Sequence, residues 1–345
     1  MKNRTSIMPM KKSRSSRREF VKNISLAGIA IANAGHISPL IQQPGNKKRI
    51  GIIGLDTSHS IEFTKTLNSA DAAEFEGYKV VVAYPKGSAD IQSSAERIPA
   101  YTEEIKKYGV RIAASIKELL DNVDVVLLET NDGRLHLEQA LLVFEAGKPV
   151  FIDKPVAASL KDVIAIYEAA KRFNVPVFSS SSLRYIPDAE EIAKGKYGKV
   201  SGADVYSPAH LEKTHPDLFW YGIHGVELLF TIMGTGCESV TRINTPGTDV
   251  VVGTWKDERI GVFRGLRSGK LDYGGTVYAE NNIITLGTFQ GYNALLVQII
   301  KFFESGKSPV DNKDTLEIYA FMEAADESKR KGGIAVSIES VLEKT

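Results

Sequence analysis

The chain has 345 residues, of which 43% are hydrophobic and 25% charged, a composition that fits a folded protein of about two domains and excludes a disordered chain. Its formal net charge is +1, from 43 Lys and Arg residues against 42 Asp and Glu residues, so the basic excess typical of a nucleic-acid-binding protein is missing. The one cysteine, Cys237, excludes an internal disulfide and a cysteine-rich metal site.

The first 34 residues differ in charge from the rest of the chain. They hold eight Lys and Arg residues and one acid, Glu19, which leaves 35 basic and 41 acidic residues, a charge of −6, for residues 35–345. The pair Arg17-Arg18, with Phe20 after it, precedes an apolar run over 24–32 that is too short to span a bilayer. With Ala34 as the cleavage point, this layout resembles a twin-arginine export signal over 1–34. We therefore expect a periplasmic mature protein that is not held at a membrane; a disordered basic tail is the alternative.

Alternating strand and helix patterns follow a predicted linker over 35–48. Strand-like apolar runs occur at 49–55, 78–84, 110–113, 123–129, 149–152 and 175–179. Helical patterns lie between them at 89–97, 116–120, 135–146 and 160–173. This alternation predicts parallel βαβ units with helices on both faces, which is a doubly wound, nucleotide-binding α/β domain over 49–175.

After residue 180 the pattern changes to short strands of alternating polarity. These are predicted at 200–206, 240–244, 249–255, 260–264 and 274–279, with helices at 292–305 and 315–331. Residues 176–345 are therefore predicted to form an α+β domain on a mostly antiparallel open sheet.

The turn after the first strand carries only part of a dinucleotide-binding motif. Such a site uses Gly-x-Gly-x-x-Gly, and here only Gly54 is present. Asp56 places an anion where a phosphate would approach, whereas Thr57, Ser58 and His59 offer side chains and backbone N–H groups at a helix N-terminus. An ordinary capped strand-to-helix turn is the alternative.

The end of the second strand bears on the choice of cofactor. NAD-selective enzymes usually place an acid there to bind the ribose diol, but this sequence has Lys86 and Ser88. A cation and a hydroxyl favour the 2′-phosphate of NADP, and a solvated lysine in a turn is the alternative.

The strongest signal is the run 146–155, which ends in Asp153-Lys154-Pro155 after a predicted strand. It resembles the Gfo/Idh/MocA oxidoreductase family, whose hallmark is Glu-Lys-Pro after a strand preceded by Ala-Gly-Lys-x-Val. The resemblance extends over nearly all of 49–338 and includes further short segments: His136, Arg184-Tyr185, the run 221–225, the run 292–309 and the run 324–328.

This resemblance implies a Rossmann domain, a second domain whose open sheet serves homo-oligomerisation, and an active site between the two. It implies oxidation or reduction of a sugar or cyclitol hydroxyl with NAD(P), with Lys154 near nicotinamide and substrate and His224 as the proton acceptor or donor. A cis Lys154–Pro155 peptide is also implied. The positions that it matches to cofactor contacts are Thr130, Asn131, His136, Asp153 and Lys154.

Two departures from the family pattern concern the catalytic groups. Asp153 replaces the usual Glu, and Trp220 stands where family members often have an Asp that orients the histidine. We considered three groups as replacements for that Asp, namely Tyr221, Asp217 and Glu227. Trp220 is also expected to stack on a sugar face.

The remaining candidates are less specific. Arg184 and Tyr185 are predicted substrate contacts, with a cap and a packing ring as the alternatives, and His210 and His215 are weaker candidates. Because the histidines form no close cluster in the sequence, we expect no metal site.

The functional prediction is an NAD(P)-dependent oxidoreductase that acts on a carbohydrate, glycoside or polyol, with a weak preference for NADP. Two alternatives remain open. One is an NAD-dependent enzyme that cleaves glycosides by transient oxidation and elimination, and the other is a non-catalytic protein that binds a sugar or nucleotide on a degenerate Rossmann scaffold.

Export is the part of this prediction that can be tested without a substrate. We expect protein recovered from the periplasm to begin at Gly35, because cleavage after Ala34 removes the basic segment. N-terminal sequencing measures this directly, and periplasmic protein that begins at Met1 would contradict it.

Overall fold

The computed structural model describes residues 48–69 and 72–344. The predicted export signal, its cleavage point and residues 35–47 of the predicted linker lie outside this part of the chain.

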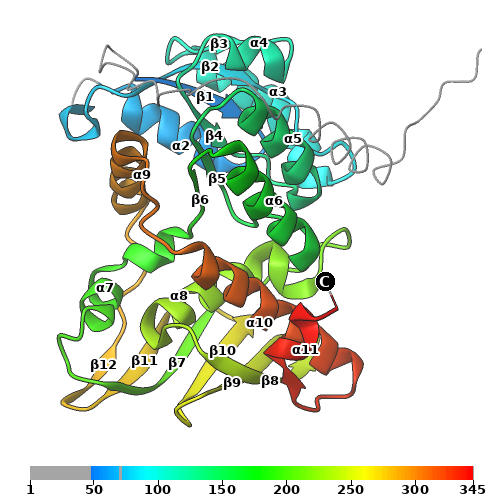
Figure 1. The fold of residues 1–345 in the computed structure, drawn as a ribbon, viewed down its shortest axis with the longest axis vertical. Coiled ribbons are helices and arrows are strands. Elements are labelled where there is room, and N and C mark those ends of the chain that lie inside the picture. The colour runs from blue at the N-terminus through cyan, green and yellow to red at the C-terminus, as the bar shows by residue number, and fades with distance from the viewer. Residues whose placement is uncertain (1–47, 70–71, 345) are drawn as a thin grey trace, which may run out of the picture. The chain divides into compact units, whose positions relative to one another are not determined.

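A six-stranded, all-parallel sheet begins at the first described residues (Figure 1). Its order is β3-β2-β1-β4-β5-β6, as expected for a doubly wound fold. The strands are β1 (Arg49–Ile53), β2 (Lys79–Tyr84), β3 (Arg111–Ile112), β4 (Val125–Leu128), β5 (Val150–Ile152) and β6 (Val177–Phe178). Between them lie α2 (Ser58–Leu67), η1 (Ala72–Phe75), α3 (Gln92–Lys106), α4 (Ile116–Leu120), α5 (Gly133–Glu145) and α6 (Leu160–Phe173).

The helices cover both faces of this sheet. Buried side chains of α4, α5 and α6 share one apolar cluster with Ile53 and Val126, whereas those of α2 share a second cluster with Ile50 and Leu127. Successive strand residues therefore point to opposite faces of the sheet, and both faces are buried. This explains why these strands are continuous apolar runs in the sequence.

Two sequence-based boundaries are wrong. The helix predicted to end at Arg97 continues through Pro99 to Lys106, because one proline removes only one backbone donor and α3 lies mainly at the surface. The domain boundary at 175 is also misplaced, since β6 pairs with β5 through Val150 and Val177.

A helix from the second half of the chain also belongs to the first sheet. The helix α9 (Asn293–Ser305) buries Leu296, Ile299 and Phe302 in the cluster that holds Ile50 and Phe63, and Figure 1 shows it beside α2. An apolar helix pattern indicates that one face is buried but not which sheet buries it.

The second sheet has seven strands in the order β12-β11-β7-β10-β9-β8-β13, and only β7 and β10 are parallel neighbours. Its strands are β7 (Val200–Pro208), β8 (Cys237–Thr245), β9 (Thr248–Trp255), β10 (Ile260–Leu266), β11 (Gly274–Ala279), β12 (Asn282–Thr285) and β13 (Val336–Ser337). The predicted mostly antiparallel sheet is confirmed. The short strands β12 and β13 had no clear sequence signal.

One face of the second sheet is covered by α8 (Ile223–Met233) and α10 (Asn312–Arg330). Side chains alternate along the strands, so that Ile243 and Ile260 are 65% and 52% exposed on the other face. Homo-oligomerisation through this sheet stays a prediction. The remaining short helices are η2 (Ser182–Tyr185), α7 (Pro187–Ala193), η3 (Leu218–Gly222) and α11 (Ile338–Leu342). In the described part of the chain, every helix is too short or too polar to cross a membrane.

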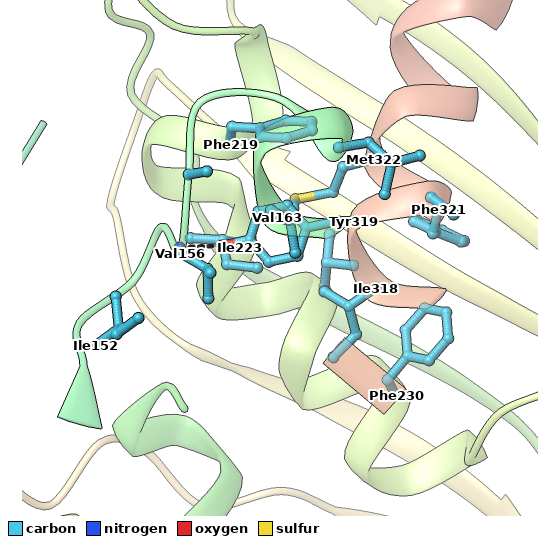
Figure 2. Packing of buried hydrophobic residues seen from close by; sticks show 14 of the residues in the cluster. Ile152, Val156, Val163, Phe219, Ile223, Phe230, Ile318, Tyr319, Phe321 and Met322 are labelled. Carbon is cyan, nitrogen blue, oxygen red and sulfur yellow. Dashed lines mark hydrogen bonds between the residues drawn. The ribbon is translucent and has the colours of Figure 1, made fainter. Parts of the chain in front are cut away.

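A buried hydrogen bond connects α10 to the loop after β5. Figure 2 shows Tyr319 packed among the apolar side chains of α10, with its hydroxyl bonded to the backbone of Val156. The Val156 N–H donates to Tyr319 Oη at 2.5 Å, and the tyrosine is 1% exposed. Since Val156 comes two residues after Lys154, the second domain fixes the loop that carries this lysine.

The phenylalanine variant Tyr319→Phe tests this connection. It leaves the Val156 N–H buried without an acceptor, so we expect the free energy of unfolding to fall by about 1–3 kcal/mol. Urea unfolding followed by tryptophan fluorescence measures this change. The control is Tyr278→Phe, which removes an exposed hydrogen bond to Asp204 and should cost less than about 0.5 kcal/mol. Equal losses in the two variants would contradict the assignment.

Candidate active site

The turn between β1 and α2 needs its single glycine and buries its acid. Gly54 has φ +95°, and a Cβ there would lie 2.5 Å from the backbone of Thr130. Asp56 is fully buried and accepts the backbone N–H groups of Ser88, at 3.3 Å, and Asn131, at 3.0 Å. Asp56 therefore ties the ends of three parallel strands together, and its carboxylate does not lie in the path of a phosphate as the sequence suggested.

A cavity of about 320 Å³ lies at the carboxyl ends of these strands, between the first sheet and α8. The predicted site residues that line it are Thr57, Ser58, His59, Asn131, Lys154, Trp220, Tyr221 and His224, together with the weaker candidate His210. Seven further lining residues were missed in the sequence: Ser93, Arg97, Ser182, Leu183, Tyr273, Phe289 and Tyr292.

The cavity lining has the donors that a dinucleotide requires. Thr57 caps α2, and its first turn leaves backbone N–H groups without helical partners. Arg97 of α3 adds a guanidinium group, and Asn131 adds an amide after β4. These groups fit a pyrophosphate, so the residues present fit the predicted cofactor.

Several predicted cofactor contacts are instead structural. His136 is fully buried, with Nε2 2.6 Å from the Thr130 carbonyl oxygen and Nδ1 3.1 Å from the Val156 carbonyl oxygen. Ser88 is buried and donates to Asp90, whereas Lys86 is exposed outside the cavity lining. These two residues therefore no longer support the preference for NADP.

The predicted substrate contacts after β6 are also outside the cavity lining. The Arg184 Nε donates to Glu227 Oε1 at 2.9 Å, and the ring of Tyr185 is largely buried, which raises the pKa of its hydroxyl. The packing ring given as the alternative fits Tyr185, whereas Arg184 is an ion-pair partner of Glu227 and not the cap that was its alternative. A polar residue near a strand end can serve the backbone as readily as a ligand.

Lys154 lines the cavity and forms an ion pair with the buried carboxylate of Asp153. Its Nζ donates to Asp153 Oδ2 at 3.1 Å, and His59 Nδ1 lies 3.1 Å from the same oxygen. Burial lowers the pKa of Lys154, but the Asp153 carboxylate outweighs this and the net shift is upward. Burial raises the pKa of Asp153, but His59 and Lys154 together lower it by more than burial raises it, so the net shift is downward. The hallmark lysine is therefore an ammonium group at neutral pH. The Lys154–Pro155 peptide is cis, as the resemblance implied.

A second buried acid lies beside this ion pair. Glu129 Oε2 is 4.0 Å from His59 Nδ1, and burial followed by the Asp153 charge raises the pKa of Glu129 well above its ordinary value. The ligand atoms of His59, Glu129 and Asp153 lie within 4.8 Å of one another, a grouping typical of metal ligands. The sequence did not reveal this group, because three separate segments supply it. Lys154 already neutralises Asp153 and a protonated Glu129 carries no charge, so the cluster is balanced without a cation.

The partner of His224 is a serine. His224 Nδ1 lies 2.8 Å from Ser181 Oγ, and Trp220 lies 4.9 Å, ring to ring, from His215. Of the three candidate replacements for the family's Asp, Asp217 forms an ion pair with Arg242, and Glu227 accepts the backbone N–H of Ser181. The ring centroid of Tyr221 lies 5.0 Å from that of the His224 imidazole, but the Tyr221 hydroxyl forms its hydrogen bond with the Tyr273 hydroxyl. Burial, followed by the charges of Lys154 and His59, lowers the pKa of His224 well below its ordinary value.

Comparisons with known proteins agree with this geometry. Residues 48–181 match the model of Gfo/Idh/MocA, described as an oxidoreductase family with an NAD-binding Rossmann fold. A 1,5-anhydro-D-fructose reductase of Ensifer adhaerens is 33% identical over 133 residues, which are 35% of this chain and 39% of the reductase. An uncharacterised oxidoreductase of Streptococcus pneumoniae is 28% identical over 41% of this chain and 42% of its own length. The chain thus matches less than half of either relative.

Solved structures extend the fold likeness to both domains. A scyllo-inositol dehydrogenase of Lactobacillus casei, solved with NAD(H) and scyllo-inositol, has a TM-score of 0.67 at 16% identity, covering 85% of this chain and 99% of that one. A myo-inositol 2-dehydrogenase of Lactobacillus plantarum has a TM-score of 0.67 at 16% identity, covering 84% and 98%. Residues 48–181 are therefore similar to an NAD-binding oxidoreductase domain, and both domains share the fold of these dehydrogenases.

The buried ion pair makes a stability prediction. Asp153→Asn leaves the Lys154 ammonium buried without its counter-charge, so we expect unfolding free energy to fall by about 3–5 kcal/mol. The double variant Asp153→Asn with Lys154→Met removes the orphaned charge and should regain much of that loss. Urea unfolding measures both. The surface control Asp121→Asn, which breaks an exposed pair with Lys117, should cost no more than about 0.5 kcal/mol.

The pKa shifts of Asp153 and Lys154 set the pH range over which their ion pair stabilises the folded protein. The lowered pKa of Asp153 means that its contribution is complete above the ordinary value of 3.8 and is lost as pH falls through the folded value. The raised pKa of Lys154 means that its contribution is complete below 10.5 and is lost as pH rises through the folded value. In Asp153→Asn, burial lowers the pKa of Lys154 without the opposing carboxylate, so the cost of burying its ammonium falls as pH rises towards 10.5. The margin of the wild type over Asp153→Asn should therefore be largest at acidic to neutral pH, above 3.8, and shrink as pH rises. A margin that grows as pH rises would contradict the assignment.

Proposed function

We propose that the chain is an NAD(P)-dependent oxidoreductase that acts on a hydroxyl, or the corresponding ketone, of a carbohydrate, glycoside or polyol. The observation that carries this is the content of one cavity. Its lining brings together the α2 N-terminus, Arg97 and Asn131 with Lys154 and His224. Anion-binding groups and proton-transfer groups therefore share one space, as hydride transfer to a nucleotide requires.

The chemistry needs a proton path beside the hydride path. The bound dinucleotide would supply or accept the hydride. A carbinol carbon gives up hydride only as its oxygen loses a proton, so a titratable group must reach that oxygen. Lys154 and His224 both line the cavity, and the ammonium of Lys154 also stabilises negative charge on the reacting oxygen.

The rest of the cavity suits a ring-shaped, hydroxylated substrate. Five aromatic side chains line it, and their faces can pack on the apolar C–H surface of a sugar or cyclitol: Trp220, Tyr221, Tyr273, Phe289 and Tyr292. The names of the relatives, an anhydrosugar reductase and two inositol dehydrogenases, support the same substrate class.

The cofactor and the cell compartment belong to this proposal in finer detail. Arg97, in place of Lys86 and Ser88, is the cation positioned for either the pyrophosphate or a 2′-phosphate. The segment that resembles a twin-arginine signal supports export to the periplasm, by a pathway that carries folded proteins. Such an enzyme would keep its nucleotide tightly bound.

The test combines cofactor detection with one variant. We expect mass spectrometry of gently denatured protein to find a dinucleotide, or titration to show NAD or NADP binding. Lys154→Ala leaves His59 as the partner of Asp153, so it should fold with a lower free energy of unfolding and still bind the dinucleotide. It should lose at least about 10²-fold in kcat on a panel of cyclic polyols and sugars, because the proton donor is gone. Nicotinamide absorbance measures turnover.

The control is Lys117→Ala on the exposed face of α4, which should behave like the wild type. A fully active Lys154→Ala variant would overturn the site. Release of phenol from aryl glycosides without net nicotinamide reduction would favour the elimination mechanism. Absence of any dinucleotide, bound or titrated, would leave only a binding function.

A further inference from the structure

The hydroxyl group of Ser181 has two buried neighbours. Its Oγ accepts the backbone N–H of Leu183 at 3.2 Å and lies 2.8 Å from His224 Nδ1. Ser181 is 1% exposed and His224 is 6% exposed, so solvent has little access to this contact. A hydroxyl has one proton to give and two lone pairs, and the Leu183 N–H occupies one lone pair.

The destination of that one proton decides the state of the imidazole. Within residues 48–69 and 72–344, the Ser181 hydroxyl has no other recorded hydrogen-bond acceptor than His224 Nδ1. If Nδ1 carried a proton, the Ser181 O–H would be a buried donor without an acceptor, which costs about 1–3 kcal/mol. The lower-energy arrangement has Ser181 donating and Nδ1 accepting.

We propose that Ser181 is a positioning residue that holds neutral His224 with its proton on Nε2, so that His224 donates a hydrogen bond to the substrate oxygen while Lys154 moves the proton. This rests on the proposed function for its substrate. It differs from the role that the sequence predicted for His224, which was to take or give that proton.

Glu227 keeps Ser181 in place. Its carboxylate accepts the Ser181 backbone N–H at 2.8 Å and the Ser180 hydroxyl at 2.7 Å. Glu227 and His224 are three residues apart on α8, so one helix face carries both the imidazole and the acid that anchors its partner. The acid that an ordinary Asp–His pair would place directly on the ring acts here through a serine.

The charges around the ring agree with a neutral imidazole. The charged groups that act on His224 are Lys154 from the loop after β5, His59 from α2 and Asp153. The rings of Tyr221 and Tyr273 lie 5.0 Å and 6.3 Å from its imidazole ring, between centroids. A second cation beside the Lys154 ammonium would be repelled, and Ser181 offers no negative charge to offset this.

The resulting step balances. In the reducing direction, hydride adds to the carbonyl carbon and the C=O π electron pair moves to oxygen, which accepts one proton from the Lys154 ammonium. The amine that remains keeps its contact with Asp153 and regains a proton from solvent. His224 Nε2–H donates a hydrogen bond to the oxygen throughout and ends unchanged, as a neutral donor in an oxyanion site does. In the oxidising direction, the Lys154 ammonium first releases a proton to solvent, and the amine then takes the hydroxyl proton as the hydride leaves the carbinol carbon.

Nitrogen NMR of protein labelled with ¹⁵N-histidine tests the tautomer without any cofactor. His224 is assigned as the signal lost in His224→Asn. We expect the wild type to show a protonated Nε2 and an unprotonated Nδ1. Ser181→Thr, which keeps the hydroxyl, should preserve this pattern. Ser181→Asp should move the proton to Nδ1 and raise the His224 pKa by about 1–2 units. The matched control Ser180→Ala removes bonds to Glu227 and to the Ser181 carbonyl oxygen but none to His224, and it should leave the pattern unchanged.

A protonated Nδ1 in the wild type, or a pattern that Ser181→Asp leaves unchanged, would overturn the proposal. Kinetics supply the second arm. A glutamine amide can donate a hydrogen bond from nearly the position of Nε2 but cannot serve as a base. We therefore expect His224→Gln to lose less than about tenfold in kcat and His224→Ala to lose about 10²–10³-fold.

Equal losses in His224→Gln and His224→Ala would overturn the donor role. If the protein binds no dinucleotide, the proposed function fails, while the NMR arm still decides the assignment of Ser181. The two failures are therefore distinguishable.

Discussion

The site depends on one buried anion, the Asp153 carboxylate at the end of β5. It is fully buried, and its Oδ2 accepts a hydrogen bond from Lys154 Nζ and lies 3.1 Å from His59 Nδ1. Because its charge is balanced only by these neighbours, it keeps Lys154 protonated in a place where burial alone would favour the amine. Burial is the main cause that favours a neutral Glu129 and a neutral His224. The ion pair adds to it, because the Asp153 charge raises the pKa of Glu129 and the Lys154 charge lowers the pKa of His224.

The rest of the site is held by polar anchors that never face the ligand. Asp56 binds the backbone after β2 and β4, Tyr319 binds the backbone after β5, and Glu227 binds the backbone after β6. Parallel strands end at one edge of their sheet, and their loops carry unpaired backbone donors there. Buried side-chain acceptors satisfy these donors and make the loops rigid, so the cavity groups they carry are positioned before any ligand binds.

The fold and the centre of the site could be predicted from local patterns. The apolar runs of the parallel sheet, the lone Gly54 and the Asp153-Lys154-Pro155 run are each contained in a few consecutive residues. The direction of a side chain at a strand end is not. Asp56, His136 and Arg184 are polar residues near the ends of strands, where ligand contacts were predicted. Asp56 instead binds a backbone amide, His136 a backbone carbonyl and Arg184 a buried acid. Arg97 was missed because it lies on a helix with mostly exposed residues, which reaches the cavity only in the folded chain.

The sequence by itself determined the class of fold, the order of its two sheets and the lysine and histidine at the site, because hydrophobic periodicity and short motifs are local properties. Only the tertiary structure decided that α9 covers the first sheet, that Ser181 and not Tyr221, Asp217 or Glu227 contacts His224 Nδ1, and that Glu129 lies beside Asp153 and His59. These contacts join residues tens to hundreds of positions apart. Their identity depends on how buried polar groups find partners after the chain has closed, which no local pattern records.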